Sequence, residues 1–302
     1  MTTGDERSGR DAYLTIQQAS RLLQVPAPTL RSWERRYGIP AVERSTGGHR
    51  RYTPEHVRML RRMRDAIAHG QSALSAAQAV KATQLVSTEP LVEEFLSAAE
   101  RLDSVGVRQI LDSARTVLGL DRTVDELLFP AMQQIGRDWR IGRCDVAHEH
   151  LATETSRAWL SRVEVGGTHQ REQRPIVLAS GPRDQHTLGL ESIGALLRYR
   201  GWDCRLLGAS LPVESLHTAL RTINPSALVL VSHLSVARRS AVESLRTARA
   251  SRVHVFYAGN AFLSPQSRQG VPGIYLGENL SAAADLITRT VAESAAVTDT
   301  GS

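Results

Sequence analysis

Residues 176–189 read Ile-Val-Leu-Ala-Ser-Gly-Pro-Arg-Asp-Gln-His-Thr-Leu-Gly. This stretch begins with a short apolar run that is typical of a buried strand, and it ends where a helical pattern starts. The same alternation continues along the chain. The β-rich runs are Ile176–Ser180, Cys204–Leu207, Ala227–Ser232, Val253–Ala258 and a weaker Ile274–Leu276, and the helical stretches are Leu188–Tyr199, Val213–Thr222, Arg239–Ala248 and Leu280–Val291. The pattern predicts a doubly wound α/β domain with a mostly parallel sheet over residues 175–295.

The loop in this stretch carries a candidate ligand-binding histidine. His186 follows the first predicted strand, and doubly wound sheets bind ligands at the carboxyl ends of their strands. Asp184 can hydrogen-bond the imidazole and fix which nitrogen is free, as a metal-ligating histidine requires, and Gly189 permits close approach of the backbone. A loop histidine by itself is more often a surface or capping residue. Small or apolar side chains at two later strand ends leave a channel for a long ligand; they are Ser232, Leu234 and Gly259.

Residues 91–165 have apolar side chains three and four positions apart, which predicts a helical bundle. Trp139 ends one predicted helix, and Asp145 can cap the next. On that next helix, Val146, Glu149 and His150 are spaced so that they share one face. We interpret this face as ligand-binding, the alternative being a solvated helix edge.

Residues 1–83 have the pattern of a helix-turn-helix followed by a wing. Thr15 and Gln18 form a capping box at the start of the first helix, and Pro26 and Pro28 open the second. The polar face of that second helix predicts contacts in a DNA major groove; it comprises Thr29, Arg31, Ser32 and Arg35. The paired glycines 47 and 48 predict a tight turn whose flanking residues reach DNA; these are Arg44, His49, Arg50, Arg51 and Tyr52.

The net positive charge of the chain is concentrated in residues 1–83, which we call the head. Residues 1–80 contain 13 arginines and 7 acidic residues, an excess of six that equals the formal charge of the whole chain. Such asymmetry favours nucleic acid as the partner over a uniformly solvated surface. No apolar run approaches the roughly 18 residues of a membrane span, and two cysteines are too few for a disulfide framework. We therefore expect a cytoplasmic protein without a membrane partner.

The head resembles the MerR family of regulators. The resemblance rests on residues 29–38, Thr-Leu-Arg-Ser-Trp-Glu-Arg-Arg-Tyr-Gly, followed by Gly-His-Arg-Arg-Tyr at residues 48–52. It covers roughly the first 70 residues. It implies a winged helix-turn-helix domain that binds double-stranded DNA as a dimer.

The α/β domain resembles the cobalamin-binding domain shared by methionine synthase and several mutases, which is Rossmann-like. The matching pattern is Asp-x-His-x-x-Gly at residues 184–189, Ser-x-Leu at 232–234 and a final pair at 258–259. The final pair departs from the pattern, being Ala-Gly and not Gly-Gly. By this resemblance His186 is the lower axial ligand of cobalt, and the cofactor's own base lies in the channel near Ser232, Leu234 and Gly259.

Trp139, nine intervening residues and then Glu149-His150 match the signature of the CarH/LitR light-dependent regulators. These regulators have the head, the helical bundle and the α/β domain, which acts as the sensor, in the same order. The resemblance therefore covers nearly the whole chain. It implies that Trp139, Val146, Glu149 and His150 face the adenosyl group of adenosylcobalamin. It also implies a repressor that is a homo-oligomer, a tetramer as in the family, and that releases DNA when light breaks the cobalt–carbon bond.

Two alternatives stay open at this point. Arg140 occupies a position where some of these regulators carry a histidine that captures cobalt after photolysis, which favours a light-insensitive regulator sensing corrinoid level or a protein partner. The other alternative is a cobalamin enzyme. The head and bundle leave no segment for a substrate barrel, so we expect a protein that is not an enzyme.

Overall fold

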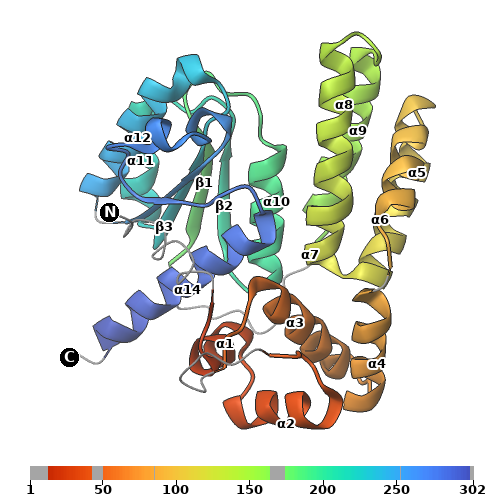
Figure 1. Ribbon diagram of the computed structural model, residues 1–302. Helices are drawn as coiled ribbons and strands as arrows, with labels where there is room; N and C mark the ends of the chain where they lie inside the picture. Colours follow the sequence, from red (N-terminus) through yellow and green to blue (C-terminus); the bar gives the residue numbers. More distant parts are fainter. Residues whose placement is uncertain (1–12, 43–49, 85, 164–173, 252, 300–302) are drawn as a thin grey trace, which may run out of the picture. The chain divides into compact units, whose positions relative to one another are not determined.

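The computed structural model describes residues 13–42, 50–84, 86–163, 174–251 and 253–299, and it divides the chain into two compact units. The first unit is Met1–Ser87 and the second is Thr88–Ser302. Figure 1 labels the helices and strands of both units, and each unit is described by itself. Among the described residues, no helix combines the length and the apolar character that crossing a membrane requires.

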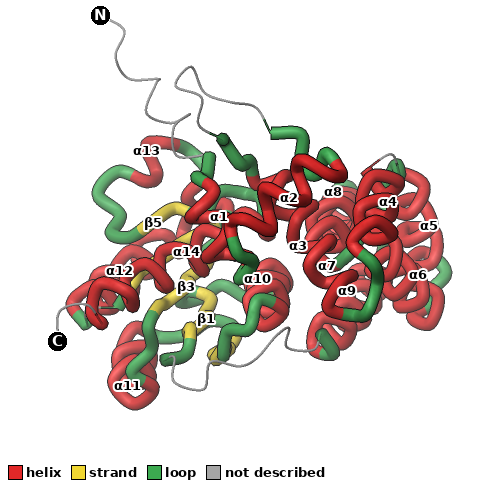
Figure 2. Tube along the Cα trace, turned by 90° about the horizontal axis from the view of Figure 1, so that it is seen from below, coloured by secondary structure: helices red, strands yellow, loops and turns green. Residues whose placement is uncertain are grey.

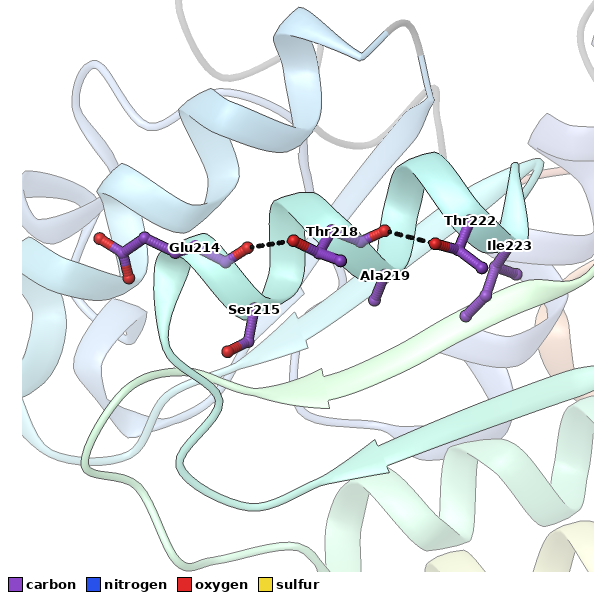
Figure 3. A pocket seen from close by; sticks show the side chains of 6 residues that line it. All are labelled: Glu214, Ser215, Thr218, Ala219, Thr222 and Ile223. Atoms are coloured by element: carbon purple, nitrogen blue, oxygen red, sulfur yellow. Dashed lines mark hydrogen bonds between the residues drawn. The ribbon is translucent and has the colours of Figure 1, made fainter.

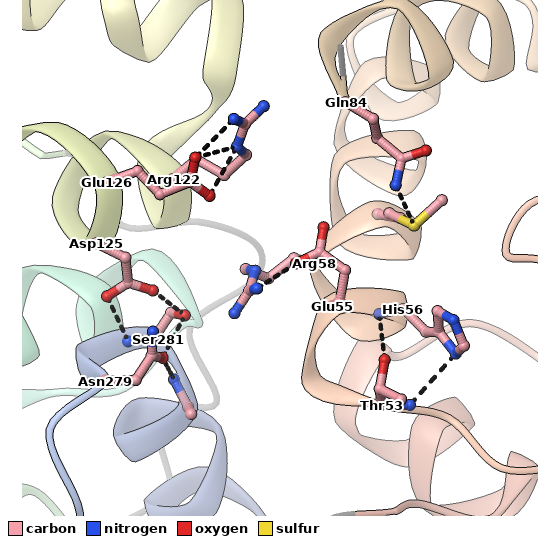
Figure 4. A network of polar contacts seen from close by, with 12 residues as sticks. Thr53, Glu55, His56, Arg58, Gln84, Arg122, Asp125, Glu126, Asn279 and Ser281 are labelled. Atoms are coloured by element: carbon pink, nitrogen blue, oxygen red, sulfur yellow. Dashed lines mark hydrogen bonds and ion pairs between the residues drawn. The ribbon is translucent and has the colours of Figure 1, made fainter. Parts of the chain in front are cut away.

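The described part of the first unit contains four helices and a short bridge between extended segments. The helices are α1 (Ile16–Leu23), α2 (Ala27–Tyr37), α3 (Pro54–Ala68) and α4 (Ala73–Gln84). The predicted capping box at Thr15 is present, and Thr53 caps α3 in the same way with His56 (Figure 4). Leu14 and Tyr52 pair as an isolated antiparallel bridge. These elements enclose one apolar core, which includes Leu23, Leu30, Trp33, Tyr52, Leu60, Met63 and Val80.

The second unit begins with a helical bundle. Its elements are α5 (Glu89–Glu100), α6 (Ser104–Leu118), α7 (Leu120–Arg122), the π-helical turn η1 (Thr123–Leu128), α8 (Phe129–Arg140) and α9 (Val146–Ser161). Gly142 adopts a left-handed φ of +72° between α8 and α9, and Asp145 caps α9, so the chain reverses where the sequence predicted a break. Apolar residues at helical spacing, such as Phe95 and Leu111, form the bundle core.

A five-stranded, all-parallel sheet follows in the order β2-β1-β3-β4-β5. Its strands are β1 (Ile176–Ser180), β2 (Cys204–Gly208), β3 (Ala227–Val231), β4 (His254–Ala258) and β5 (Ile274–Tyr275). The remaining elements are α10 (Leu188–Tyr199), α11 (Val213–Ile223), η2 (Ser235–Ala237), α12 (Arg238–Ala250), η3 (Asn260–Phe262), α13 (Pro265–Arg268) and α14 (Leu280–Asp299). The predicted fold class, a helical head and bundle with a Rossmann-like sheet, is confirmed.

Helices cover both faces of the sheet (Figures 1 and 2). Alternate residues of a strand point to opposite faces, so Ile176 and Leu178 of β1 pack with α10 and α14, whereas Val177 and Ala179 pack with α11 and α12. The face with α10 and α14 shares one continuous core with the helical bundle. The carboxyl ends of β1, β3 and β4 consequently lie at one edge of a rigid, doubly covered sheet.

Polar contacts fix the bundle to the sheet domain within this second unit. Asp125 in the π-helical turn accepts hydrogen bonds from the backbone N–H groups of Leu280 and Ser281, at 3.1 and 3.2 Å, and thereby caps α14 (Figure 4). The buried guanidinium of Arg200 pairs with Asp121 at 3.1 Å and with Asp285 at 2.7 Å. The bundle is therefore held against α10 and α14 by charged and capping contacts as well as by apolar packing.

Candidate functional site

The loop between β1 and α10 holds His186 in one orientation. The backbone N–H of His186 donates to Oδ1 of Asp184 at 3.0 Å, and the ring Nδ1 lies 2.9 Å from the same oxygen. Because an ionised carboxylate can only accept, Nδ1 carries a ring proton, and in the neutral imidazole Nε2 keeps its lone pair. Asp184 is fully buried, whereas the His186 side chain is 64% exposed. Asp184 thus holds Nδ1 of the His186 imidazole, whereas Nε2 is accessible to a metal.

A second histidine contacts the same carboxylate. His233, which follows β3, donates its backbone N–H to Oδ2 of Asp184, and its Nδ1 lies 3.3 Å from that oxygen. The two imidazole centroids are 5.4 Å apart. The sequence analysis did not include His233 among the site residues. The sequence did contain a signal for His233, because this polar residue comes shortly after a predicted strand, and neighbouring parallel strands end at the same edge of a sheet.

The electrostatics of this cluster favour an ionised Asp184. Burial raises the pKa of the Asp184 carboxyl, but hydrogen bonds from His186 and His233 outweigh burial and bring this pKa well below its usual range. The hydrogen bond to Asp184 raises the pKa of His186 against the opposing effect of burial, and the charge of Glu149 raises it further. Glu149 of the bundle therefore lies within electrostatic reach of His186.

The ends of β3 and β4 pack closely together. The hydroxyl oxygen of Ser232 is buried and has no hydrogen-bond partner among the described residues. Gly259 has a φ of +103°, and a Cβ there would lie 2.2 Å from the carbonyl oxygen of Ser232. Leu234, two residues after Ser232, is partly exposed. The unpartnered Ser232 hydroxyl can donate a hydrogen bond to a polar ligand, whereas the glycine at position 259 is required by the nearby backbone of Ser232.

The predicted bundle residues lie at the α8–α9 hairpin. Trp139 at the end of α8 is 52% exposed, and Val146 at the start of α9 is 44% exposed. Glu149 accepts a hydrogen bond from the Thr153 hydroxyl at 2.8 Å, and Nε2 of the exposed His150 lies 3.6 Å from a Glu149 oxygen. Large apolar side chains that stay exposed at one hairpin are candidates to cover a ligand.

Gly189 packs against the bundle. A Cβ at Gly189 would be 3.5 Å from the Phe129 ring of α8, which is an ordinary packing distance. The residue thus occupies the contact between α10 and α8. Nothing in this distance requires glycine, so its predicted role in cofactor binding stays a prediction.

In the first unit, α2 separates a buried and an exposed face as predicted. Leu30 and Trp33 are buried, whereas Arg31 and Arg35 are exposed. Thr29 and Ser32 are partly exposed beside them. The exposed face of α2 therefore combines guanidinium and hydroxyl groups, which suit phosphates and base edges.

The predicted wing residues Arg50 and Arg51 differ in their partners. Arg51 is exposed, and its guanidinium lies 5.2 Å from the centre of the Tyr13 ring. Arg50 donates from Nε to Glu34 of α2 at 2.6 Å, and this hydrogen bond raises the pKa of Arg50. The predicted contacts of Arg44 and His49 lie outside the described residues.

Tyr52 corrects one prediction. Its side chain is fully buried in the core of the first unit, and its hydroxyl has no hydrogen-bond partner among the described residues. Successive residues of an extended segment point in opposite directions, so the exposure of Arg51 requires Tyr52 to point inward. Tyr52 therefore anchors the segment after the wing and is not a side-chain contact to DNA.

We expect Arg35→Ala to weaken operator DNA binding and to lower the slope of log affinity against log salt by about one, since one phosphate contact is lost. Arg221→Ala on α11, which removes the same charge from the second unit, is the matched control. Binding isotherms at several salt concentrations measure both slopes. Equal slopes for Arg35→Ala and the parent would remove Arg35 from the DNA contacts.

An open hollow of about 480 Å³ lies along α11 and is a weaker candidate (Figure 3). The hydroxyls of Thr218 and Thr222 already donate to backbone carbonyls of the same helix, at 3.1 and 3.0 Å. A hollow lined by one helix, with its hydroxyl protons already used, lacks the convergent polar groups of a ligand site. The lining residues are Glu214, Ser215, Thr218, Ala219, Thr222 and Ile223.

Two protein families match successive parts of this chain. Residues 14–82 match the MerR HTH family regulatory protein, and residues 91–164 match the B12 binding domain. The structure of the monomethylamine corrinoid protein of Methanosarcina barkeri superposes with a TM-score of 0.55 at 12% identity. That superposition covers 68% of this chain and all of the corrinoid protein, and it shows a shared fold.

Two curated relatives extend across both units. The HTH-type transcriptional repressor CarA of Myxococcus xanthus is 32% identical over 222 residues, which cover 72% of this chain and 75% of CarA. The HTH-type transcriptional repressor CarH of the same organism is 29% identical over 276 residues, covering 83% of this chain and 90% of CarH. With its MerR-type head and its B12-binding domain in one chain, the protein belongs to the CarA/CarH family of HTH-type transcriptional repressors.

Proposed function

We propose that this DNA-binding, corrinoid-binding regulator is a repressor that holds adenosylcobalamin, binds its operator as an oligomer and releases DNA in the light. The observation that carries the proposal is the open Nε2 of His186, whose Nδ1 is held by the buried Asp184 at the end of β1. Membership in a family of transcriptional repressors favours a regulator over a cobalamin enzyme.

The residues of the second unit fit a corrinoid. His186 would ligate cobalt from the lower side, because its free nitrogen is accessible and Asp184 fixes the tautomer. Ser232 would hydrogen-bond the displaced base, since its buried hydroxyl lacks a partner among the described residues, and Gly259 would lie beside it. Trp139 and Glu149 would cover the upper side together with Val146 and His150. When bound, adenosylcobalamin supplies a cobalt–carbon bond that light can break.

Oligomer formation would turn the state of the sensor into a change in DNA affinity. Several heads joined in one assembly bind neighbouring half-sites at a high effective concentration, which raises affinity without any new contact. Trp139 and Val146 are exposed apolar residues at the α8–α9 hairpin, and a bound ligand would cover them. A ligand that binds one assembly state more tightly shifts the equilibrium toward that state.

Illumination tests this proposal. The full chain loaded with adenosylcobalamin in the dark should elute from gel filtration earlier than after green light, and its operator affinity should fall at least ~100-fold on illumination, as expected for lost avidity. The absorption spectrum before and after light reports the cofactor itself. A chain loaded with cyanocobalamin, which lacks the adenosyl group, is the control and should not respond. An unchanged elution volume after photolysis would refute the light switch.

Arg140 favours a second candidate function. The residue is exposed directly after Trp139, and a guanidinium has no lone pair to offer cobalt. In this alternative the same domain senses the level of corrinoid, without a light response. Operator binding that depends on added corrinoid but is equal in darkness and light would support it.

A further inference from the structure

Asp184, His186 and His233 form a group of three potential metal ligands. One ligand atom from each of these residues lies within 4.8 Å of the other two. The carboxylate is fully buried, and the two histidines come from loops after the neighbouring strands β1 and β3. Two imidazoles and one carboxylate, with further positions open, are a common ligand set for zinc and related divalent ions.

We propose that, in the corrinoid-free protein, Asp184 and the Nδ1 atoms of His186 and His233 bind a divalent transition-metal ion such as Zn²⁺. The consequence for the sensor rests on the proposed function, because the ion and cobalt would compete for the same imidazole. Zinc occupancy would thus keep the protein in the state without cofactor.

The geometry needs only small movements to accept an ion. Both Nδ1 atoms already point at Asp184, at 2.9 Å for His186 and 3.3 Å for His233. Donor atoms bound to zinc at about 2.0–2.2 Å lie about 3–4 Å from one another, so a slight rotation of the exposed His186 ring suffices. The backbone N–H groups of both histidines also donate to Asp184, and they would continue to orient the carboxylate after the ring hydrogen bonds are replaced.

The tautomer explains why the two metals exclude each other. A neutral imidazole carries a single ring proton, which now lies on Nδ1 of His186 facing Asp184. If zinc binds at Nδ1, that proton moves to Nε2, and Nε2 loses the lone pair that cobalt requires. Each ring retains its one proton, so the exchange needs no other reactant.

Titration calorimetry with ZnCl₂ on the corrinoid-free full chain tests the site. We expect one zinc ion per chain and at least ~10-fold weaker binding for His233→Ala, because a ligand is lost. His217→Ala, which removes an exposed histidine from α11, is the matched control and should bind zinc as the parent does. Hydroxocobalamin should then bind zinc-loaded parent more slowly and more weakly, whereas zinc should not affect hydroxocobalamin binding to His233→Ala.

Two results would overturn the proposal: no zinc binding by the parent, or equal zinc affinities for the parent and His233→Ala. In either case the histidines only hydrogen-bond Asp184. The proposed function fails separately. Zinc binding with the expected loss in His233→Ala, together with no histidine-ligated corrinoid spectrum in the zinc-free parent, would keep the zinc site and refute the corrinoid assignment.

Discussion

Replacing His186 with alanine should abolish the spectral signature of histidine-ligated cobalt and weaken corrinoid binding by about 100-fold or more. Loss of a residue that only orients a metal ligand already costs about 10–100-fold, and His186 is the proposed ligand itself. The surrounding fold should survive, because the His186 side chain is 64% exposed and Asp184 keeps its hydrogen bonds from His233. Absorption spectra of the purified chain titrated with hydroxocobalamin measure both effects.

The exposed His217 on α11 again provides the matched control for this substitution. His217→Ala removes an imidazole of similar exposure far from the β1 loop in sequence, and it should bind the corrinoid with the parent spectrum. Circular dichroism of His186→Ala should equal that of the parent. A parent-like cobalt spectrum in His186→Ala would show that another group ligates the metal, and the axial assignment of His186 would have to be abandoned.

Gly259→Ala should destabilise the second unit by about 2–6 kcal/mol, since strained backbone and overpacking each cost about 1–3 kcal/mol. Gly259 has a φ of +103°, and a Cβ would lie 2.2 Å from the backbone oxygen of Ser232. Backbone atoms cannot rotate away as a flexible side chain does. We expect a fall in Tm of roughly 4 °C or more in calorimetry, together with weaker corrinoid binding.

Gly208→Ala, at the end of β2, is the control that separates the cost of the steric clash at Gly259 from the cost of a left-handed backbone. Gly208 has a φ of +82°, but an added Cβ there would meet no atom within 4 Å. Its cost should therefore be limited to the left-handed conformation, about 1–2 kcal/mol. If the two variants lowered Tm equally, the predicted clash between a Cβ at position 259 and the backbone of Ser232 would not contribute to the loss of stability.

Local signals explain why so much of the architecture could be predicted. The capping box at Thr15 and the cap at Asp145 are formed by groups within three residues, so they leave a readable pattern in the sequence. The predicted strands at Ile176 and Ala227 begin where the structure begins them, because buried parallel strands are short continuous apolar runs. Asp184 and His186, two residues apart, form the hydrogen bond that their spacing indicated.

Contacts between distant residues could not be read from these patterns. Asp125 caps α14 through Ser281, 156 residues later, and no periodicity connects the two positions. Arg50 looks like any basic wing residue until the fold brings Glu34 within 2.6 Å of it. The same applies to Tyr52, whose burial depends on pairing with Leu14.

The sequence by itself determined the order of the domains, the family and the position of His186 after the first strand. It could do so because hydrophobic periodicity, helix caps and short motifs each depend on residues that are close together in the sequence. Only the tertiary structure decided which groups share the Asp184 carboxylate. His233 lies 49 residues away and reaches Asp184 because the sheet places β3 directly beside β1. Strand order is fixed by the packing of the whole domain, so the chemistry at the strand ends depends on the complete fold.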